Sequence, residues 1–421
     1  MANELPSIHI TENQHYVPRF YLKNFGIAAR KKRSSDSFVS FYQFNDKLCK
    51  DSIPTKSICY KSYFYGEDGK LEKEFSTKES VWAAAIRTAI EMSEFALTPD
   101  QECAIKEFLI YQYIRTSSSL NYAKDVAKEV ITDHISNVFD LPKSDAVLQQ
   151  LVVEKVNKDI HAEDLVGEAN QLLHELDDLC ISVIHFNTTK KLITSDTPVI
   201  PLNPFSFKGA GFATVGIIIL LPISPEKLIA VYDSKIYPSM QPYMNCTDES
   251  DVETANKYQV ISAEERIIGK TCSELQLAIS DSDVMHSREF FQQQPKLMSS
   301  FDGNGTFLGI HAREIVYSYD MNLFKLPKQV KKIPKDHRTT LLRSYSRESW
   351  INLLVRVYRI PDLLKRERHL DDSTVKRYRD GNSKLLRFME DYWNIPMEDR
   401  TLSPDFIYKL QTVPTTFFEA K

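Results

Sequence analysis

The stretch "NQHYVPRFYLKNFG", from Asn13 to Gly26, places one histidine, His15, beside basic and aromatic residues. Pro is favoured in the first turn of a helix and Gly often ends one, so "PRFYLKNFG" predicts a short helix that closes at Gly26. Arg19 and Lys23 share one face of this helix because they are four residues apart. Two interpretations of His15 stay open: a core residue satisfied by a hydrogen bond, or a side chain that faces a cleft.

Two glutamates in "LEKEFSTKE" form a second group with possible chemistry. On one continuous helix, Glu72 and Glu79 would lie on the same face two turns apart, and this spacing can hold a divalent metal with a third ligand. The alternative is a capping box, in which Ser76 starts the helix at Thr77 and Glu79 turns back toward the backbone. Glu72 would then lie outside the helix.

Arg115 and Asp196 complete the set of candidate side chains. Arg115 ends the predicted helix "DQECAIKEFLIYQYIR", where it either complements the helix dipole or uses its planar fork to grip a phosphate or carboxylate. Asp196 follows a predicted strand in "TSDTP". There it either makes an Asx turn or acts as a catalytic carboxylate at the end of a strand.

The enzyme hypothesis is that four of these side chains meet in a cleft: His15, Glu79, Arg115 and Asp196. The carboxylates and the histidine would hold or activate a water, with a divalent metal such as Mg²⁺ as a possible cofactor, and the arginine would stabilise charge on a phosphate. Such a site would suit metal-assisted phosphodiester cleavage. One alternative is a non-catalytic sensor or adaptor that binds nucleic acid or an acidic partner protein. Another is an enzyme that acts on a nucleotide or protein target without metal.

The elements that must position these residues come in separate blocks. Helical spacing of apolar residues predicts helices between about residues 79 and 179, the last of them over 146–179. β-branched segments after Cys180 predict a mainly antiparallel sheet around residues 180–235, followed by a helix over about 251–268. Helices and strands that do not alternate indicate an α+β domain, which we place at residues 1–285.

The remaining residues, 286–421, read as a basic and mostly helical C-terminal region. Residues 325–379 contain 16 Lys and Arg against 6 Asp and Glu, a local balance of +10 in a chain whose net charge is −4. This region either binds nucleic acid or docks onto the acidic first domain. The candidate contacts are Arg343, Arg347, Lys365 and Arg366. A partner protein or a homo-oligomer is also compatible with this charge division.

The cysteines and the apolar segments bear on location. The six cysteines are scattered without a CxxC pair, so they read as buried thiols in a reducing cytosol. The first residues lack the apolar stretch of a secretory signal, and the longest apolar run, "VGIIILLPI", is well short of the roughly 20 residues that span a bilayer. We therefore expect a soluble cytoplasmic protein.

The opening stretch "HYVPRFYLKNF" resembles the signature HYVPxFYLxxF of the bacterial domain-of-unknown-function family no. 4238. Three further segments match the same pattern over about residues 10–280: "LEKEFSTKE", "LITSDTPVIPL" and "LLPISPEKLIAVYD". The resemblance implies a bacterial cytosolic protein of the kind often encoded in mobile or phage-defence gene neighbourhoods. With the residues above, it leads us to expect a defence-type effector acting on nucleic acid. The matching recurrent positions are His15, Pro18, Phe25, Glu79, Arg115, Ser195, Asp196 and Pro198.

Overall fold

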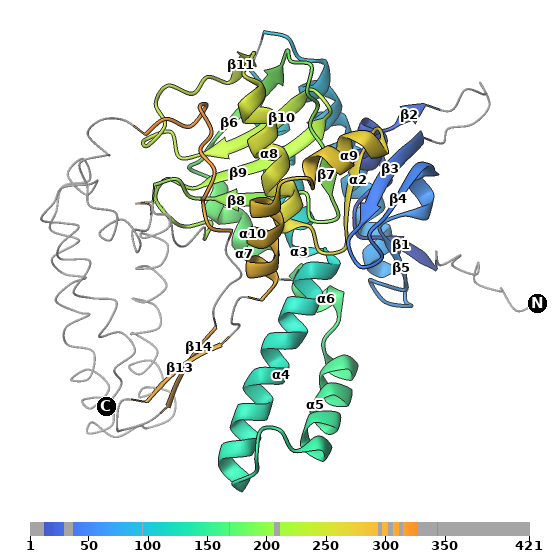
Figure 1. The fold of residues 1–421 in the computed structure, drawn as a ribbon, viewed down its shortest axis with the longest axis vertical. Coiled ribbons are helices and arrows are strands. Elements are labelled where there is room, and N and C mark those ends of the chain that lie inside the picture. The colour runs from blue at the N-terminus through green and yellow to red at the C-terminus, as the bar shows by residue number, and fades with distance from the viewer. Residues whose placement is uncertain are drawn as a thin grey trace, which may run out of the picture.

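A computed structural model describes residues 12–28, 37–94, 96–167, 169–205, 211–293, 297–301, 306–310, 315–326 and 343 of the 421-residue chain. Within these residues, helices cover mainly antiparallel sheets (Figure 1), which confirms the predicted α+β class. Most of the basic C-terminal region lies outside the described residues, so its predicted helices stay a prediction.

The central sheet has five strands in the order β11-β6-β10-β9-β8. Neighbouring strands are antiparallel except β11 and β6, which are parallel. The strands are β6 (Cys180–Phe186), β8 (Ile200–Leu202), β9 (Ile218–Ser224), β10 (Lys227–Tyr232) and β11 (Tyr243–Cys246). Every residue of β10 is buried, as expected for a strand that is covered on both faces.

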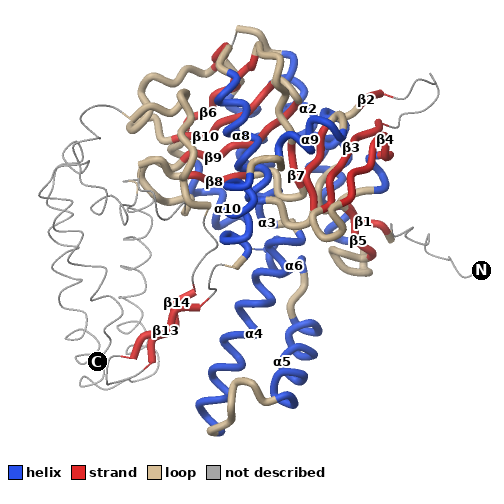
Figure 2. The backbone as a smooth tube through the Cα atoms, viewed as in Figure 1, coloured by secondary structure: helices blue, strands red, loops and turns tan. Residues whose placement is uncertain are grey.

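Helices cover both faces of this sheet, and the sheet separates two hydrophobic clusters. Ile219 of β9 packs in one cluster with Trp82 and Phe108, while the next residue, Leu220, packs in the other cluster with Tyr258. This alternation follows from the period of two in a strand. The helices involved are α2 (Lys70–Glu91), α3 (Pro99–Ile114), α8 (Glu249–Ser262) and α10 (Ser282–Gln292). Figure 2 shows α8 and α10 side by side in front of the sheet.

A second sheet joins the two ends of the first 270 residues. Its order is β2-β3-β12-β7, with β4 also paired to β3. The strands are β2 (Ile27–Ala28), β3 (Ser37–Gln43), β4 (Leu48–Pro54), β7 (Thr194–Ser195) and β12 (Arg266–Gly269). The predicted helix over 251–268 was wrong at its end, because α8 stops at Ser262 and Ile267 and Ile268 pair with Tyr42 and Phe41 of β3.

Smaller elements complete the described fold. β1 (Asn13–His15) pairs with β5 (Tyr60–Ser62), and α1 (Arg19–Leu22) continues as a 3₁₀ turn over Lys23–Phe25. The predicted helix over 146–179 is broken into α5 (Ala146–Asp159), α6 (Ala162–Gly167) and α7 (Ala169–Leu173). The remaining elements are α4 (Ser117–Phe139), α9 (Cys272–Ala278), β13 (Leu297–Phe301) and β14 (Thr306–Ile310). In Figure 1, α4 and α5 project from the body as a helical hairpin.

Gly26 ends the opening helix as predicted, but close packing is the reason. Its backbone is extended, with φ −103° and ψ 175°. A Cβ at this position would lie 2.8 Å from the carbonyl oxygen of Phe38 on β3. Gly26 therefore lets the opening motif approach β3 directly.

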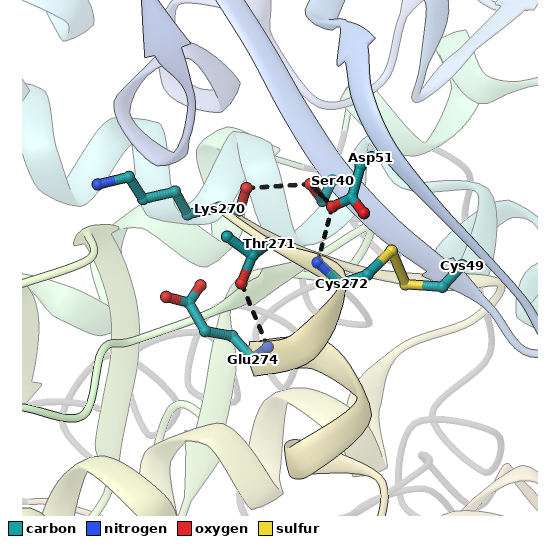
Figure 3. The surroundings of a disulfide bond; sticks show 7 residues. All are labelled: Ser40, Cys49, Asp51, Lys270, Thr271, Cys272 and Glu274. Atoms are coloured by element: carbon teal, nitrogen blue, oxygen red, sulfur yellow. Dashed lines mark hydrogen bonds between the residues drawn. A yellow bond between two sulfur atoms is a disulfide. The ribbon is translucent and has the colours of Figure 1, made fainter.

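The cysteines differ from the prediction of buried thiols. Cys49 of β4 and Cys272 at the start of α9 form a disulfide, with 5.9 Å between their Cα atoms (Figure 3). Beside it, Asp51 accepts hydrogen bonds from the Ser40 hydroxyl at 2.7 Å and from the Cys272 amide at 2.8 Å. The pairing was missed because the two cysteines are 223 residues apart and meet only through β3 and β12. Of the cysteines that are not in a disulfide, Cys103 and Cys180 are exposed.

The proposed division at residue 285 stays a prediction. α10 runs across that position and packs against α8, and Phe324 from the described segment 315–326 lies in the same core cluster. Within the described part of the chain, no helix has both the length and the apolar character that crossing a bilayer requires.

Candidate functional site

A pocket of about 350 Å³ lies where the opening motif meets α2. Its polar lining is His15, Arg19, Tyr65, Glu72, Ser76, Glu79 and Ser80. Its size is within the roughly 300–1,000 Å³ of small-molecule sites, and the histidine, carboxylates and arginine of its lining are groups that move protons and bind anions. Two of the four predicted catalytic residues, His15 and Glu79, therefore line one pocket.

Buried polar contacts hold His15 at the edge of the pocket. The side chain of Gln14, which is fully buried, accepts a hydrogen bond from the Tyr65 amide and donates one to the Gly66 carbonyl at 3.1 Å. On the other side of His15, the Tyr16 amide donates to the Cys59 carbonyl at 3.0 Å. These bonds fix the backbone of β1 on both sides of His15, whose ring lies 5.6 Å from the ring of Tyr60, measured between ring centres.

The His15 ring is half-buried and neutral at neutral pH. Burial is the main cause that lowers its pKa from 6.5 to about 4, and the positive charges of Arg19 and Arg115 lower it further. Its Nε2 atom is buried and has no hydrogen-bond partner among the described residues. A buried polar atom without a partner is uncommon in a folded protein, and in a pocket it points to a ligand or substrate group. Of the two interpretations, the position favours a side chain that faces a cleft.

Glu72 and Glu79 lie on one continuous helix, so the capping-box alternative was wrong. α2 begins at Lys70, after Gly69 with φ 67°, a left-handed conformation that glycine adopts without strain. Both glutamates line the pocket. Burial, and then repulsion by Glu79, raise the pKa of the Glu72 carboxyl above its ordinary value. Glu72 therefore holds a proton more readily than an exposed glutamate.

Arg115 lies behind the pocket, outside its described lining. Its side chain is fully buried and stacks on Phe75, with 4.9 Å from the guanidinium carbon to the ring centre. Its Nη1 donates to Glu79 Oε1 at 3.0 Å and its Nε donates to Gln112 Oε1 at 3.2 Å. Arg115 is the C-cap of α3, yet its guanidinium serves mainly to hold Glu79. Its role in this structure is positioning.

Asp196 is not among the described residues that line this pocket. It is buried at the end of β7, where its carboxylate accepts hydrogen bonds from three backbone amides, those of Glu264, Glu265 and Arg266, at 2.8–3.2 Å. Burial raises its pKa to about 6. The charge of Asp196 acts on Tyr16, whose buried side chain is not part of the pocket lining. Asp196 therefore holds the connection between α8 and β12.

The described residues do not form a ready metal site. Among them, no group of three or more His, Cys, Asp or Glu side chains is placed to hold a metal ion. Glu72 and Glu79 supply carboxylate oxygens, but among the described residues no third His, Cys, Asp or Glu is placed to share a metal ion with them. The predicted divalent metal therefore finds no preformed cage in this part of the chain.

Arg343 is the one predicted nucleic-acid contact that the structure describes. Its Nε donates to both carboxylate oxygens of Asp178 at 3.0 Å, and its Nη1 and Nη2 donate to the carbonyls of Phe212 and Glu175. Only 3% of Arg343 is exposed, so at this position the structure favours docking onto the first domain. Arg347, Lys365 and Arg366 lie outside the described residues.

Sequence reasoning left Arg19, Glu72 and the two serines of α2 out of the candidate site. A signal for this face was present in the chain: Ser76, Glu79 and Ser80 lie four, seven and eight residues after Glu72. That spacing places side chains on one face of a helix. The sequence therefore predicts that these four side chains lie on the same side of α2, provided that the helix begins before Glu72.

Comparison with known proteins gives a family for the chain. No curated protein and no solved structure matches it. The model of the family described as "Protein of unknown function (DUF4238)" matches residues 13–273, from the first residue of β1 to the residue after the disulfide cysteine Cys272. This match covers more than half of the 421 residues, and the chain is a member of the DUF4238 family.

Proposed function

We propose that this protein cleaves phosphodiester bonds in nucleic acid by acid–base catalysis in the His15 pocket, and that it serves as a defence-type effector in bacteria. One observation carries the proposal. The pocket joins a histidine whose pKa is lowered to about 4 and a glutamate whose pKa is raised, beside the cationic Arg19. Titratable groups that share a pocket and have perturbed pKa values are typical of functional sites, and such groups carry acid–base catalysis.

The two groups divide the proton transfers. Neutral His15 takes a proton at Nε2, the buried atom that has no partner among the described residues. The Glu72 carboxyl donates a proton to the leaving oxygen. Arg19 stabilises the charge that develops on the phosphate, and Arg115 keeps Glu79 in place at 3.0 Å. No step uses a metal ion.

The chemistry favours RNA as the nucleic acid. His15 takes the proton of a ribose 2′-hydroxyl, O2′ attacks phosphorus, and the bond from phosphorus to O5′ breaks as Glu72 protonates O5′. The products are a 2′,3′-cyclic phosphate and a 5′-hydroxyl. An internal nucleophile gains an effective molarity of roughly 10⁵–10⁸ M over an external one. DNA lacks this hydroxyl.

The test is cleavage of matched RNA and DNA oligonucleotides by the full-length protein in the presence of EDTA. We expect cleavage of RNA, products that end in a cyclic phosphate, and a loss of at least about 100-fold in rate for His15→Ala and for Glu72→Gln. Glu74→Gln is the matched control, because Glu74 is on the same helix but is exposed and outside the described lining.

Two results would count against the proposal. Binding of RNA without cleavage would support the non-catalytic sensor or adaptor. Cleavage that persists in both pocket variants would place the active site elsewhere.

A further inference from the structure

The end of the α4–α5 hairpin carries an apolar surface that the fold leaves uncovered. We define this tip patch by five residues in the last turn of α4, the connecting loop and the first two turns of α5: Val138, Phe139, Leu141, Val147 and Leu151. Each of them is 40–67% exposed. Figures 1 and 2 show the hairpin projecting away from the body with this end outermost.

The tip patch is a second apolar surface on α5, because the first one is already used. Leu148, Val152 and Val156 are buried against Ile131 and Ile135 of α4. This contact satisfies the hairpin itself. Val147 and Leu151 are four residues apart and form a separate, exposed stripe on α5. A helix needs only one apolar face to pack on its hairpin partner, so the second face is available for another chain.

The area of the tip patch matches what a homodimer requires. The exposed fractions of its five residues correspond to roughly 500 Å² of apolar surface per chain, or about 1,000 Å² for two chains. A standard interface buries about 1,600 Å² in total, and about 65% of it is apolar in homodimers, which is also roughly 1,000 Å². Single scattered apolar residues would fall far below this value.

The charge of the hairpin distinguishes between two candidate partners for the tip patch, a second copy of the chain and a membrane surface. Between Ser117 and Asp159 there are 5 Lys and 7 Asp or Glu, a net charge of −2. Peripheral helices that bind anionic bilayers carry an excess of Lys and Arg, which this hairpin lacks. A nearly balanced charge opposes self-association very little. The geometry points to a second copy of this chain as the occupant.

We infer that the protein is a homodimer in which the tip patches of two hairpins pack against each other. In a twofold dimer the same patch serves both chains. Phe139, which is 67% exposed, is the largest apolar side chain of the patch and the natural anchor. This inference does not depend on the function proposed for the His15 pocket.

The test is the mass of the full-length protein by sedimentation velocity between about 1 and 50 µM. We expect twice the 48.6 kDa of one chain for the wild type. Phe139→Glu combined with Leu151→Glu should give the single-chain mass, with a dimer dissociation constant raised at least about 100-fold. Leu277→Glu is the matched control, since Leu277 is also 67% exposed but lies on α9, and it should stay dimeric.

The melting temperature of each variant shows whether it is folded, and Val147→Lys is the substitute if the double variant unfolds. A wild type that stays at 48.6 kDa at the highest concentration overturns the inference, as does a folded tip variant that remains dimeric. A monomeric wild type that sediments with phosphatidylglycerol vesicles, and loses this binding with the Phe139 substitution, also overturns it in favour of a membrane surface.

Discussion

Replacement of Tyr21 by Phe tests whether the opening motif stabilises the fold independently of the pocket residue His15. Tyr21 is fully buried, and its hydroxyl lies 2.7 Å from Thr194 Oγ1 of β7 and donates to the Pro222 carbonyl of β9 at 2.6 Å. One side chain therefore connects α1 to both five-stranded sheets. Phe keeps the ring in place and removes only these two bonds.

The expected cost follows from the two lost bonds. A buried hydrogen bond contributes about 1 kcal/mol net, and a buried group left without its partner raises the cost, so we expect the free energy of unfolding to fall by about 2–3 kcal/mol. For a cooperative unit of about 260 residues (13–273), with an unfolding entropy of about 2.1 cal/mol/K per residue, that lowers the melting temperature by roughly 4–5 °C. Urea unfolding at constant m-value measures the change.

Tyr63→Phe is the matched control, because Tyr63 is 40% exposed and should change stability by less than about 0.5 kcal/mol. RNA cleavage by the Tyr21→Phe protein should stay near the wild-type rate at a temperature where it is folded, since Tyr21 is not in the described lining of the pocket. The reasoning is refuted if Tyr21→Phe is as stable as Tyr63→Phe.

Four further predictions concern the pH dependence of stability at Asp196 and at His15, the C-terminal region and the disulfide. Asp196 has its pKa raised from 3.8 to about 6, so the folded chain binds this proton more tightly and stability falls as the pH rises from about 4 to 6; Asp196→Asn should remove that loss, about 3 kcal/mol, in urea unfolding across pH. His15 has its pKa lowered to about 4, so stability rises from about pH 4 to 6.5, and His15→Gln should remove that gain. Arg343→Ala should speed proteolysis after residue 326, because the ion pair between the buried Arg343 and the partly exposed Asp178 is lost. Reduction should lower the melting temperature of the wild type, since the disulfide closes a 223-residue loop worth up to about 5 kcal/mol, but should leave Cys49→Ser unchanged.

Each of these predictions has an outcome that contradicts it. An Asp196→Asn or His15→Gln protein with the wild-type pH dependence would show that the group does not titrate as described. Unchanged proteolysis in Arg343→Ala would mean that other contacts hold the tail, with Lys235→Ala as an exposed basic control. A wild type whose melting temperature ignores reductant would contradict a stabilising Cys49–Cys272 bond.

Local signals were sufficient for the elements whose causes lie within a few residues. The helix predicted over "DQECAIKEFLIYQYIR" is α3, which begins at Pro99 after the N-cap Thr98; its capping box with Gln101 involves only neighbouring groups, and both of its bonds are present. The β-branched run of β9 and β10 likewise predicts buried strands. His15 and Glu79 were placed in one site by resemblance and residue type, and both line one pocket.

The missed features depend on segments that are distant in sequence. The sequence "ERIIG" continues the helical pattern before it, but in the structure Ile267 and Ile268 pair with β3 as a strand. Asp196 looks like a catalytic carboxylate until residues 264–266 supply three amides to it. The sequence left Glu72 open between a continuous helix and a capping box, since a local pattern cannot show that the helix already begins after Gly69. In each case tertiary pairing overrides a local preference.

The pairing of β3 with β12 also determines when the second sheet can be completed during translation. Gln43 lies opposite Arg266, so β3 leaves the ribosome 223 residues before its partner strand. At about 5–20 residues per second, that delay lasts roughly 10–45 s. During that delay, the described strands available to pair with β3 are β2 and β4, and the edge that will pair with β12 is open to a neighbouring nascent chain. A strand from the end of the family region, β12, therefore completes the sheet that strands near its beginning, β2 and β3, have started. A chain released from the ribosome before Gly269 is made keeps β3 as an unprotected edge strand.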